Sequence, residues 1–219
     1  DQIRKKKDSV LGLATGSSPL GMYKNLVEKY QEGEISFKDI RTVNLDEYIG
    51  LEPTNENSYR YFMDENLFSK IDINMANTHV PNGVADDIDD ECCKYSKMIK
   101  SIGIDIQVLG LGENGHIGFN EPGTEFDCST HVVNLTDSTI QANSRLFKSI
   151  DDVPRQAISV GISDIMSAKQ IILIVSGSQK ADALAKVLNG PVTSTVPGSI
   201  LQNHSNVMVL CDKSAATNL

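Results

Sequence analysis

Near the middle of the chain, an apolar run passes directly into a glycine-rich turn. Residues 104–112 are apolar or glycine except for Asp105 and Gln107, and further glycines follow at positions 115 and 118. Such a run is typical of a strand that is buried on both faces of a parallel sheet. Ligands bind at the carboxyl ends of strands in open parallel sheets, and glycine lets the backbone approach a ligand closely. The stretch therefore predicts a binding site in the turn that follows this strand.

The same turn carries His116 and Glu121, whose side chains suit proton transfer. Histidine both takes and gives a proton near neutral pH, and a nearby carboxylate can orient its imidazole. A histidine in a glycine-rich turn is also often only a loop residue. The glycine spacing lacks the full dinucleotide-binding fingerprint, so the turn gives little support to a nucleotide site.

Short apolar segments alternate with amphipathic segments along the rest of the chain. This alternation predicts an α/β protein with a single doubly wound, mainly parallel Rossmann-like sheet and helices on both faces. Further strands are expected at residues 9–14, 40–45, 131–135, 157–162, 170–175 and 206–211, and helices at 20–31, 59–67, 86–102, 138–147, 163–168 and 180–188. No repeat or long linker interrupts this order, so residues 1–219 form one predicted domain.

Two helix starts have the features of an anion site. Residues 15–19 lie between a strand and a helix, with Ser18 in the place of the cap and Pro19 in the first turn. Free backbone N–H groups and the helix dipole attract anions at such a position, although a well-capped helix has the same pattern. Lys180 lies near the start of another helix, where the dipole disfavours a cation unless an anion sits there.

Asp46 and Glu47 follow the strand at residues 40–45. Because side chains alternate in direction along a strand, only one of two adjacent acids can readily face a cleft. We expect Asp46 to be that residue, and the alternative is a solvated acidic loop. The isolated His79 is expected in a turn at residues 79–83 and is interpreted as structural.

Composition narrows the classes of partner. The chain has 29 acidic and 20 basic residues, a formal net charge of −9, which argues against nucleic-acid binding. No apolar run reaches the roughly 18 residues of a membrane span, so no membrane association is expected. The four cysteines lack metal-binding spacing, and reduced thiols in a cytoplasmic protein are their expected state.

Six segments, taken together and in order, resemble the glucosamine-6-phosphate deaminase (isomerase) family. They are ATGSSP at 14–19, NLDEY at 44–48, HVPNG at 79–83, GENGHIGFNEP at 112–122, ANSR at 142–145 and GSQKA at 177–181. The resemblance implies conversion of glucosamine 6-phosphate and water into fructose 6-phosphate and ammonia, in amino-sugar catabolism. It also implies that the family's first strand and most of its first helix are absent from this chain.

The resemblance assigns a role to each matching residue. Asp46 would move a proton between C2 and C1 of the sugar, and His116 would open the sugar ring, assisted by Glu121 and Asn114. The substrate phosphate would be held by Thr15, Gly16, Ser17, Ser18, Arg145 and Lys180. No metal or organic cofactor is implied, and the expected partner is a small sugar phosphate, bound by a monomer or a homo-oligomer.

One residue departs from the pattern, and two rival functions stay open. Many family members carry Asp where this chain has Asn114, which cannot ionise, so Glu121 would be the only carboxylate near His116. A 6-phosphogluconolactonase would share the fold, the phosphate site and the histidine loop, but it needs no C2 base at Asp46. A sugar-phosphate-binding regulator without catalysis is the second alternative.

Overall fold

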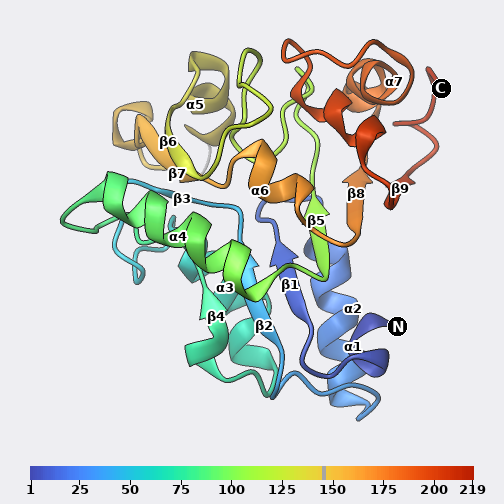
Figure 1. The fold of residues 1–219 in the computed structure, drawn as a ribbon. Helices are drawn as coiled ribbons and strands as arrows, with labels where there is room; N and C mark the ends of the chain where they lie inside the picture. The colour runs from blue at the N-terminus through green and yellow to red at the C-terminus, as the bar shows by residue number, and fades with distance from the viewer. Residues whose placement is uncertain (145–146) are drawn as a thin grey trace.

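Six parallel strands form the main sheet of the computed structural model, which describes residues 1–144 and 147–219 (Figure 1). In sheet order these strands are β4 (Thr78–His79), β2 (Arg41–Asn44), β1 (Val10–Leu13), β5 (Ile106–Leu109), β8 (Ile171–Val175) and β9 (Val207–Cys211). The α/β class and the mainly parallel sheet predicted from the sequence are confirmed. The strand order reverses on either side of β1, so the loops after β1 and β5 meet at one place, where ligands bind in such folds.

A second, antiparallel sheet corrects the expectation of a single sheet. It consists of β3 (Asp46–Tyr48), β7 (Gln156–Ser159) and β6 (His131–Asn134), in that order. The chain changes sheets at Leu45, whose N–H donates to Leu13 O at 3.2 Å and whose carbonyl accepts from Val160 N at 2.7 Å. Apolar runs predict strands but not their partners, and an antiparallel connection needs no crossover helix.

Helices cover both faces of the main sheet. Figure 1 shows α4 (Ile88–Ile102) and α6 (Ile162–Met166) in front of the strands and α2 (Leu20–Gln31) behind them. The remaining helices are α1 (Gln2–Lys5), α3 (Tyr59–Asn66), α5 (Asp137–Asn143) and α7 (Ala181–Asn189), with 3₁₀ turns at 68–70, 75–77, 150–152, 178–180 and 197–203. No helix among the described residues is long and apolar enough to cross a membrane.

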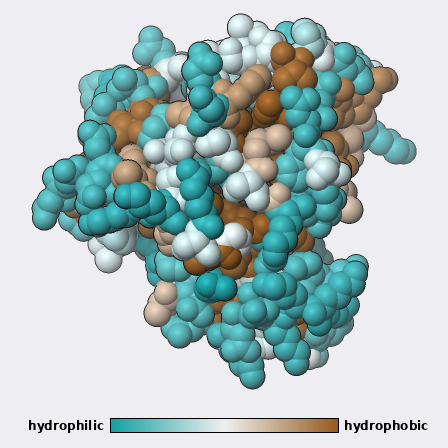
Figure 2. Space-filling model, viewed as in Figure 1, coloured by the Kyte–Doolittle hydropathy of each residue, from teal (hydrophilic) through white to brown (hydrophobic). Residues whose placement is uncertain are grey.

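Three apolar clusters hold these layers together. The largest packs α4, α6 and α7 on one face, and a second packs α2 and α3 on the other. The third surrounds Tyr48 and Phe119 beside the small sheet. On the face shown in Figure 2, hydrophilic residues dominate, and apolar ones gather near the middle and at the upper right, towards α7.

Local signals account for most element boundaries, with two exceptions. The Asp87 side chain caps α4 by accepting from Asp90 N at 2.9 Å, and acidic residues fill its first turn as the helix dipole favours. By contrast, α2 has Pro19 as its N-cap, so the expected Ser18 cap is wrong. His79 belongs to the short strand β4 and not to a turn, because it continues the pairing of β2.

Candidate active site

A cavity of about 550 Å³ opens where the loops after β1, β2 and β5 meet. Sequence segments more than 100 residues apart contribute to its wall, as parallel strand order requires. Its lining comprises Ala14, Thr15, Gly16, Ser17, Ser18, Leu45, Asp46, Tyr59, Gly110, Leu111, Gly112, Glu113, Asn114, His116, Gly118, Phe119, Thr139 and Lys180. Three of the four residues predicted to catalyse, Asp46, Asn114 and His116, therefore line one cavity, together with five of the six predicted phosphate ligands.

Glycine is required in the turn after β5 because the imidazole of His116 packs on the backbone. A Cβ at Gly112 would lie 2.4 Å from the His116 ring. The N–H of Gly112 also donates to His116 O at 2.9 Å, which closes the turn. Gly115 has φ +88°, a conformation that side chains disfavour. The glycines of this turn thus fix the position of the imidazole.

Glu121 lies next to the His116 imidazole and is held by other side chains. Its Oε1 is 3.3 Å from Nδ1 of His116, an ion-pair distance that falls short of hydrogen-bond geometry. Its Oε2 accepts from Nδ2 of Asn114 at 2.6 Å, and Oε1 accepts from the Thr139 hydroxyl at 2.8 Å. Burial alone would raise the pKa of Glu121, but His116, Asn114 and Thr139 together lower the pKa below its usual value. Glu121 is therefore ionised and acts as an acceptor.

Asp46 is the buried carboxyl group of the cavity. Its side chain is only 6% exposed, and burial, with a smaller contribution from the charge of Glu47, raises the pKa of Asp46 to about 8. A carboxylate with a raised pKa is a stronger base, which suits proton abstraction from carbon. The turn that carries His116 passes beside it, since a Cβ at Gly118 would lie 3.9 Å from Oδ2 of Asp46.

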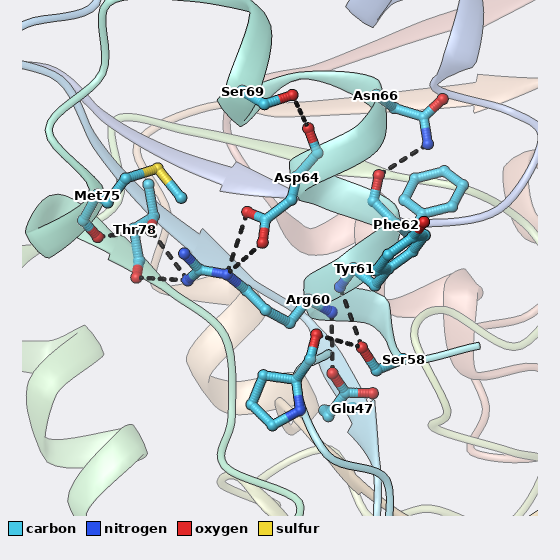
Figure 3. A network of polar contacts seen from close by, with 11 residues as sticks. Glu47, Ser58, Arg60, Tyr61, Phe62, Asp64, Asn66, Ser69, Met75 and Thr78 are labelled. Carbon is cyan, nitrogen blue, oxygen red and sulfur yellow. Dashed lines mark hydrogen bonds and ion pairs between the residues drawn. The ribbon is translucent and has the colours of Figure 1, made fainter. Parts of the chain in front are cut away.

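Glu47 points away from the cavity, as alternation along the strand predicts. Its carboxylate accepts from the backbone N–H groups of Tyr48, Tyr59 and Arg60, each at 2.9 Å. Figure 3 shows it below the first turn of α3, where Arg60 reaches across to Thr78. Burial raises the pKa of Glu47 despite these three donors. Glu47 therefore anchors α3 and so holds Tyr59 at the cavity wall.

The loop after β1 and Lys180 form a polar part of the same wall. Gly16 has φ +82°, so glycine suits the turn between β1 and α2. Lys180 is the N-cap residue of α7, and its half-buried position lowers the pKa of the ammonium, partly offset by the charge of Glu113. A cation and free hydroxyls facing one cavity suit an anionic group. Arg145, the sixth predicted phosphate ligand, lies outside the described residues.

Sequence reasoning missed three cavity residues that complete the site. Thr139 bonds Glu121, while Tyr59 and Phe119 stack with ring centroids 6.1 Å apart and form an apolar wall. The capping residue Ser58, which accepts from Tyr61 N at 3.0 Å, was a usable signal that Tyr59 begins a helix, but not that it faces the cavity. Among the described residues, no group of three or more His, Cys, Asp or Glu side chains is arranged to hold a metal ion.

Known proteins resemble the chain along nearly its whole length. Residues 1–210 match the model of the family described as glucosamine-6-phosphate isomerases/6-phosphogluconolactonase. A glucosamine-6-phosphate deaminase of Geobacillus sp. (strain WCH70) is 55% identical over 98% of this chain and 86% of its own length. The Clostridioides difficile (strain 630) protein of the same name is 53% identical over 100% of this chain and 88% of its own.

Solved structures give the same result for the fold. A monomeric glucosamine-6-phosphate deaminase superposes with a TM-score of 0.97 at 49% identity, covering 100% of this chain and 91% of that one. A 6-phosphogluconolactonase from Trypanosoma cruzi superposes with a TM-score of 0.78 at 19% identity, over 99% and 86% of the two chains. The second likeness is one of fold alone.

Proposed function

Because the chain belongs to the glucosamine-6-phosphate isomerase/6-phosphogluconolactonase family, we propose that it converts glucosamine 6-phosphate and water into fructose 6-phosphate and ammonia. Relatives at 53–55% identity that bear the deaminase name support this reaction. The observation that carries it is that the buried carboxyl group of Asp46, the imidazole of His116, the 15–18 loop and Lys180 all line one cavity. We place the reaction in cytoplasmic amino-sugar catabolism, as a hydrolytic deamination with internal isomerisation.

Ring opening is the step assigned to His116. The imidazole removes the proton of the O1 hydroxyl and returns a proton to the ring oxygen, so C1 becomes an aldehyde while the C1–O5 bond breaks. Glu121, ionised and beside Nδ1, stabilises the imidazolium that forms in between. Asn114 contributes an amide donor to the same carboxylate and no charge of its own.

Isomerisation and deamination are assigned to Asp46. The carboxylate takes the proton from C2, and the electron pair forms a C1–C2 double bond while the C2 ammonium group of the substrate passes a proton to the aldehyde oxygen. Asp46 then gives the proton to C1, which leaves a C2 iminium ion that water attacks before ammonia departs. Burial favours this role because it raises the pKa of the carboxyl group and thus its basicity.

The phosphate positions the reacting carbons. Five of the proposed phosphate ligands line the cavity, namely Thr15, Gly16, Ser17, Ser18 and Lys180, and Arg145 is proposed to join them. Binding of a group remote from the reacting atoms can align C1 and C2 with the base.

Two substrates separate this proposal from its nearest rival. Purified protein is incubated either with glucosamine 6-phosphate, following ammonia, or with 6-phosphogluconolactone, following lactone hydrolysis. We expect ammonia release, with fructose 6-phosphate formed in equal amount. Lactone hydrolysis without ammonia would establish the lactonase, and binding of glucosamine 6-phosphate without either product would establish a regulator.

A further inference from the structure

We propose that Thr139 is a positioning residue for ring opening, and that its hydroxyl holds the Glu121 carboxylate in the orientation that serves His116. This inference rests on the proposed function and adds a residue to it. Thr139 belongs to α5, which follows β6 of the small sheet, so the inference also gives that sheet a role in the chemistry.

The two oxygens of Glu121 are fixed by two different neighbours. Asn114 donates to Oε2 at 2.6 Å, and Thr139 donates to Oε1 at 2.8 Å. Oε1 is also the oxygen that lies 3.3 Å from Nδ1 of His116. With a donor on each oxygen, the plane of the carboxylate cannot rotate freely, and Thr139 controls the oxygen that faces the imidazole.

The direction of the Thr139 hydroxyl follows from its neighbours. An ionised carboxylate can only accept, so Thr139 must donate its proton to Glu121. The Oγ1 of Thr139 is then the acceptor for the Thr136 hydroxyl, 3.0 Å away. Thr136 is the N-cap of α5 and accepts from Thr139 N at 3.3 Å. The first turn of α5 therefore fixes both the place and the direction of the donor.

This restraint matters because the contact between the His116 imidazole and Glu121 lacks hydrogen-bond geometry. Nδ1 of His116 is buried, and the geometry towards Glu121 is short of ideal. Because Asn114 and Thr139 each hold one oxygen, the Glu121 carboxylate can contact the imidazolium while it keeps both hydrogen bonds. Without them, the carboxylate would be free to rotate away from the imidazolium. Thr139 is itself only 8% exposed, and valine, which has the same shape, leaves no room for a water molecule in place of the hydroxyl.

The test is a double-mutant cycle of Thr139→Val and Glu121→Ala, read as kcat for ammonia release. Valine keeps the shape of threonine and removes the donor, and we expect kcat to fall on the order of tenfold. Glu121→Ala should leave a residual kcat, which comes from sugar molecules whose ring opens without help from the enzyme. In that background Thr139→Val should cause no further fall, because the carboxylate it positions is gone.

Three measurements keep the result unambiguous. Thr139→Ser retains the hydroxyl and should restore most of the lost kcat, while thermal unfolding shows that each variant is folded. Thr217→Val removes a hydroxyl that bonds Ser214 O at 2.8 Å, far along the chain, and should leave kcat unchanged. An unchanged kcat for Thr139→Val, or an equal fall in both backgrounds, would overturn the inference. Absence of ammonia release from the unaltered protein would instead refute the proposed function.

Discussion

Asp46 and Asp105 are buried to the same degree at opposite edges of the main sheet, yet their pKa values diverge. Asp46 follows β2 and is 6% exposed, and Asp105 precedes β5 and is 5% exposed. Burial and Glu47 raise the pKa of Asp46 to about 8, whereas the pKa of Asp105 is about 2. Burial alone cannot explain opposite directions, so the difference lies in what surrounds each carboxyl group.

The amino edge of the sheet supplies partners for its acid. Burial would raise the pKa of Asp105, but it accepts from Lys169 at 2.7 Å, from Lys6 at 2.8 Å and from Val10 N at 2.8 Å. The contact with Asp105 in turn raises the pKa of Lys6. Charges at this edge neutralise one another and tie the N-terminal segment to the sheet.

The carboxyl edge keeps its charges apart. Burial raises the pKa of Asp46 and lowers the pKa of Lys180, so at both sites it disfavours the charged form of the side chain. A phosphate group on a ligand would stabilise the charged ammonium of Lys180. A proton taken from the same ligand would neutralise the carboxylate of Asp46. The contacts at the amino edge therefore stabilise the fold, whereas the carboxyl edge leaves groups available for the proposed substrate at some cost in stability.

The largest effect is expected from Asp46→Asn. Asparagine keeps the shape but cannot accept the C2 proton, so kcat should fall about a thousandfold while sugar-phosphate binding persists. Calorimetric titration with fructose 6-phosphate checks binding, and an ammonia assay checks turnover. Asp105→Asn is the matched control at the other edge and should retain kcat. Full turnover by Asp46→Asn would remove Asp46 from the mechanism.

Lys180→Ala should follow in size. Loss of a charge-assisted contact to phosphate is expected to lower kcat/KM about 10- to 100-fold, mainly through KM. Lys169→Ala, which removes a cation from the amino edge, serves as the control. Equal kinetics for Lys180→Ala and the unaltered protein would refute the assigned phosphate position.

The pH dependence should report Asp46. Because its carboxylate is the proposed active form, kcat/KM should rise about tenfold per pH unit below about 8 and then level off. Glu47→Gln should move this limb to lower pH, since Glu47 contributes to the raised pKa of Asp46. Substrate ionisation would give a limb at the same pH in both proteins, and that result would contradict the assignment.

The smallest effects are opposite changes in stability. Asp105→Asn should lower the free energy of unfolding at pH 7 by about 1–3 kcal/mol, whereas Asp46→Asn should raise it by about 1–2 kcal/mol. The lowered pKa of Asp105 gives stability that is present above pH about 4 and lost as pH falls towards 2. The raised pKa of Asp46 gives stability that is lost as pH rises towards 8. Urea unfolding across pH 2–9 measures both, and shifts of the same sign for the two variants would contradict the different environments assigned to the two carboxyl groups.

Sequence reasoning reached the parts of the site that depend on strand ends. Apolar runs located the strands, and their parallel order brought Asp46, His116 and the 15–18 loop to one edge. The choice of Asp46 over Glu47 for the cavity followed from alternation along a strand, and the structure places both side chains accordingly.

Contacts made by packing were out of reach. Thr139 meets Glu121 only because α5 docks against the glycine-rich turn, and no periodicity encodes that docking. The small sheet was missed for the same reason, since strand partners depend on long-range pairing. Arg145 stays a prediction.

The change of sheet at Leu45 has a consequence for substrate selection. The N–H of Leu45 forms a hydrogen bond to the main sheet and its carbonyl accepts one from the small sheet. The residue before Asp46 is therefore held by both sheets. The part of the cavity wall that would face C2 of the sugar cannot move outward without breaking both of these hydrogen bonds. Sugars with a bulky acyl group on the C2 nitrogen should therefore be excluded sterically, because this wall cannot move to make room for the group.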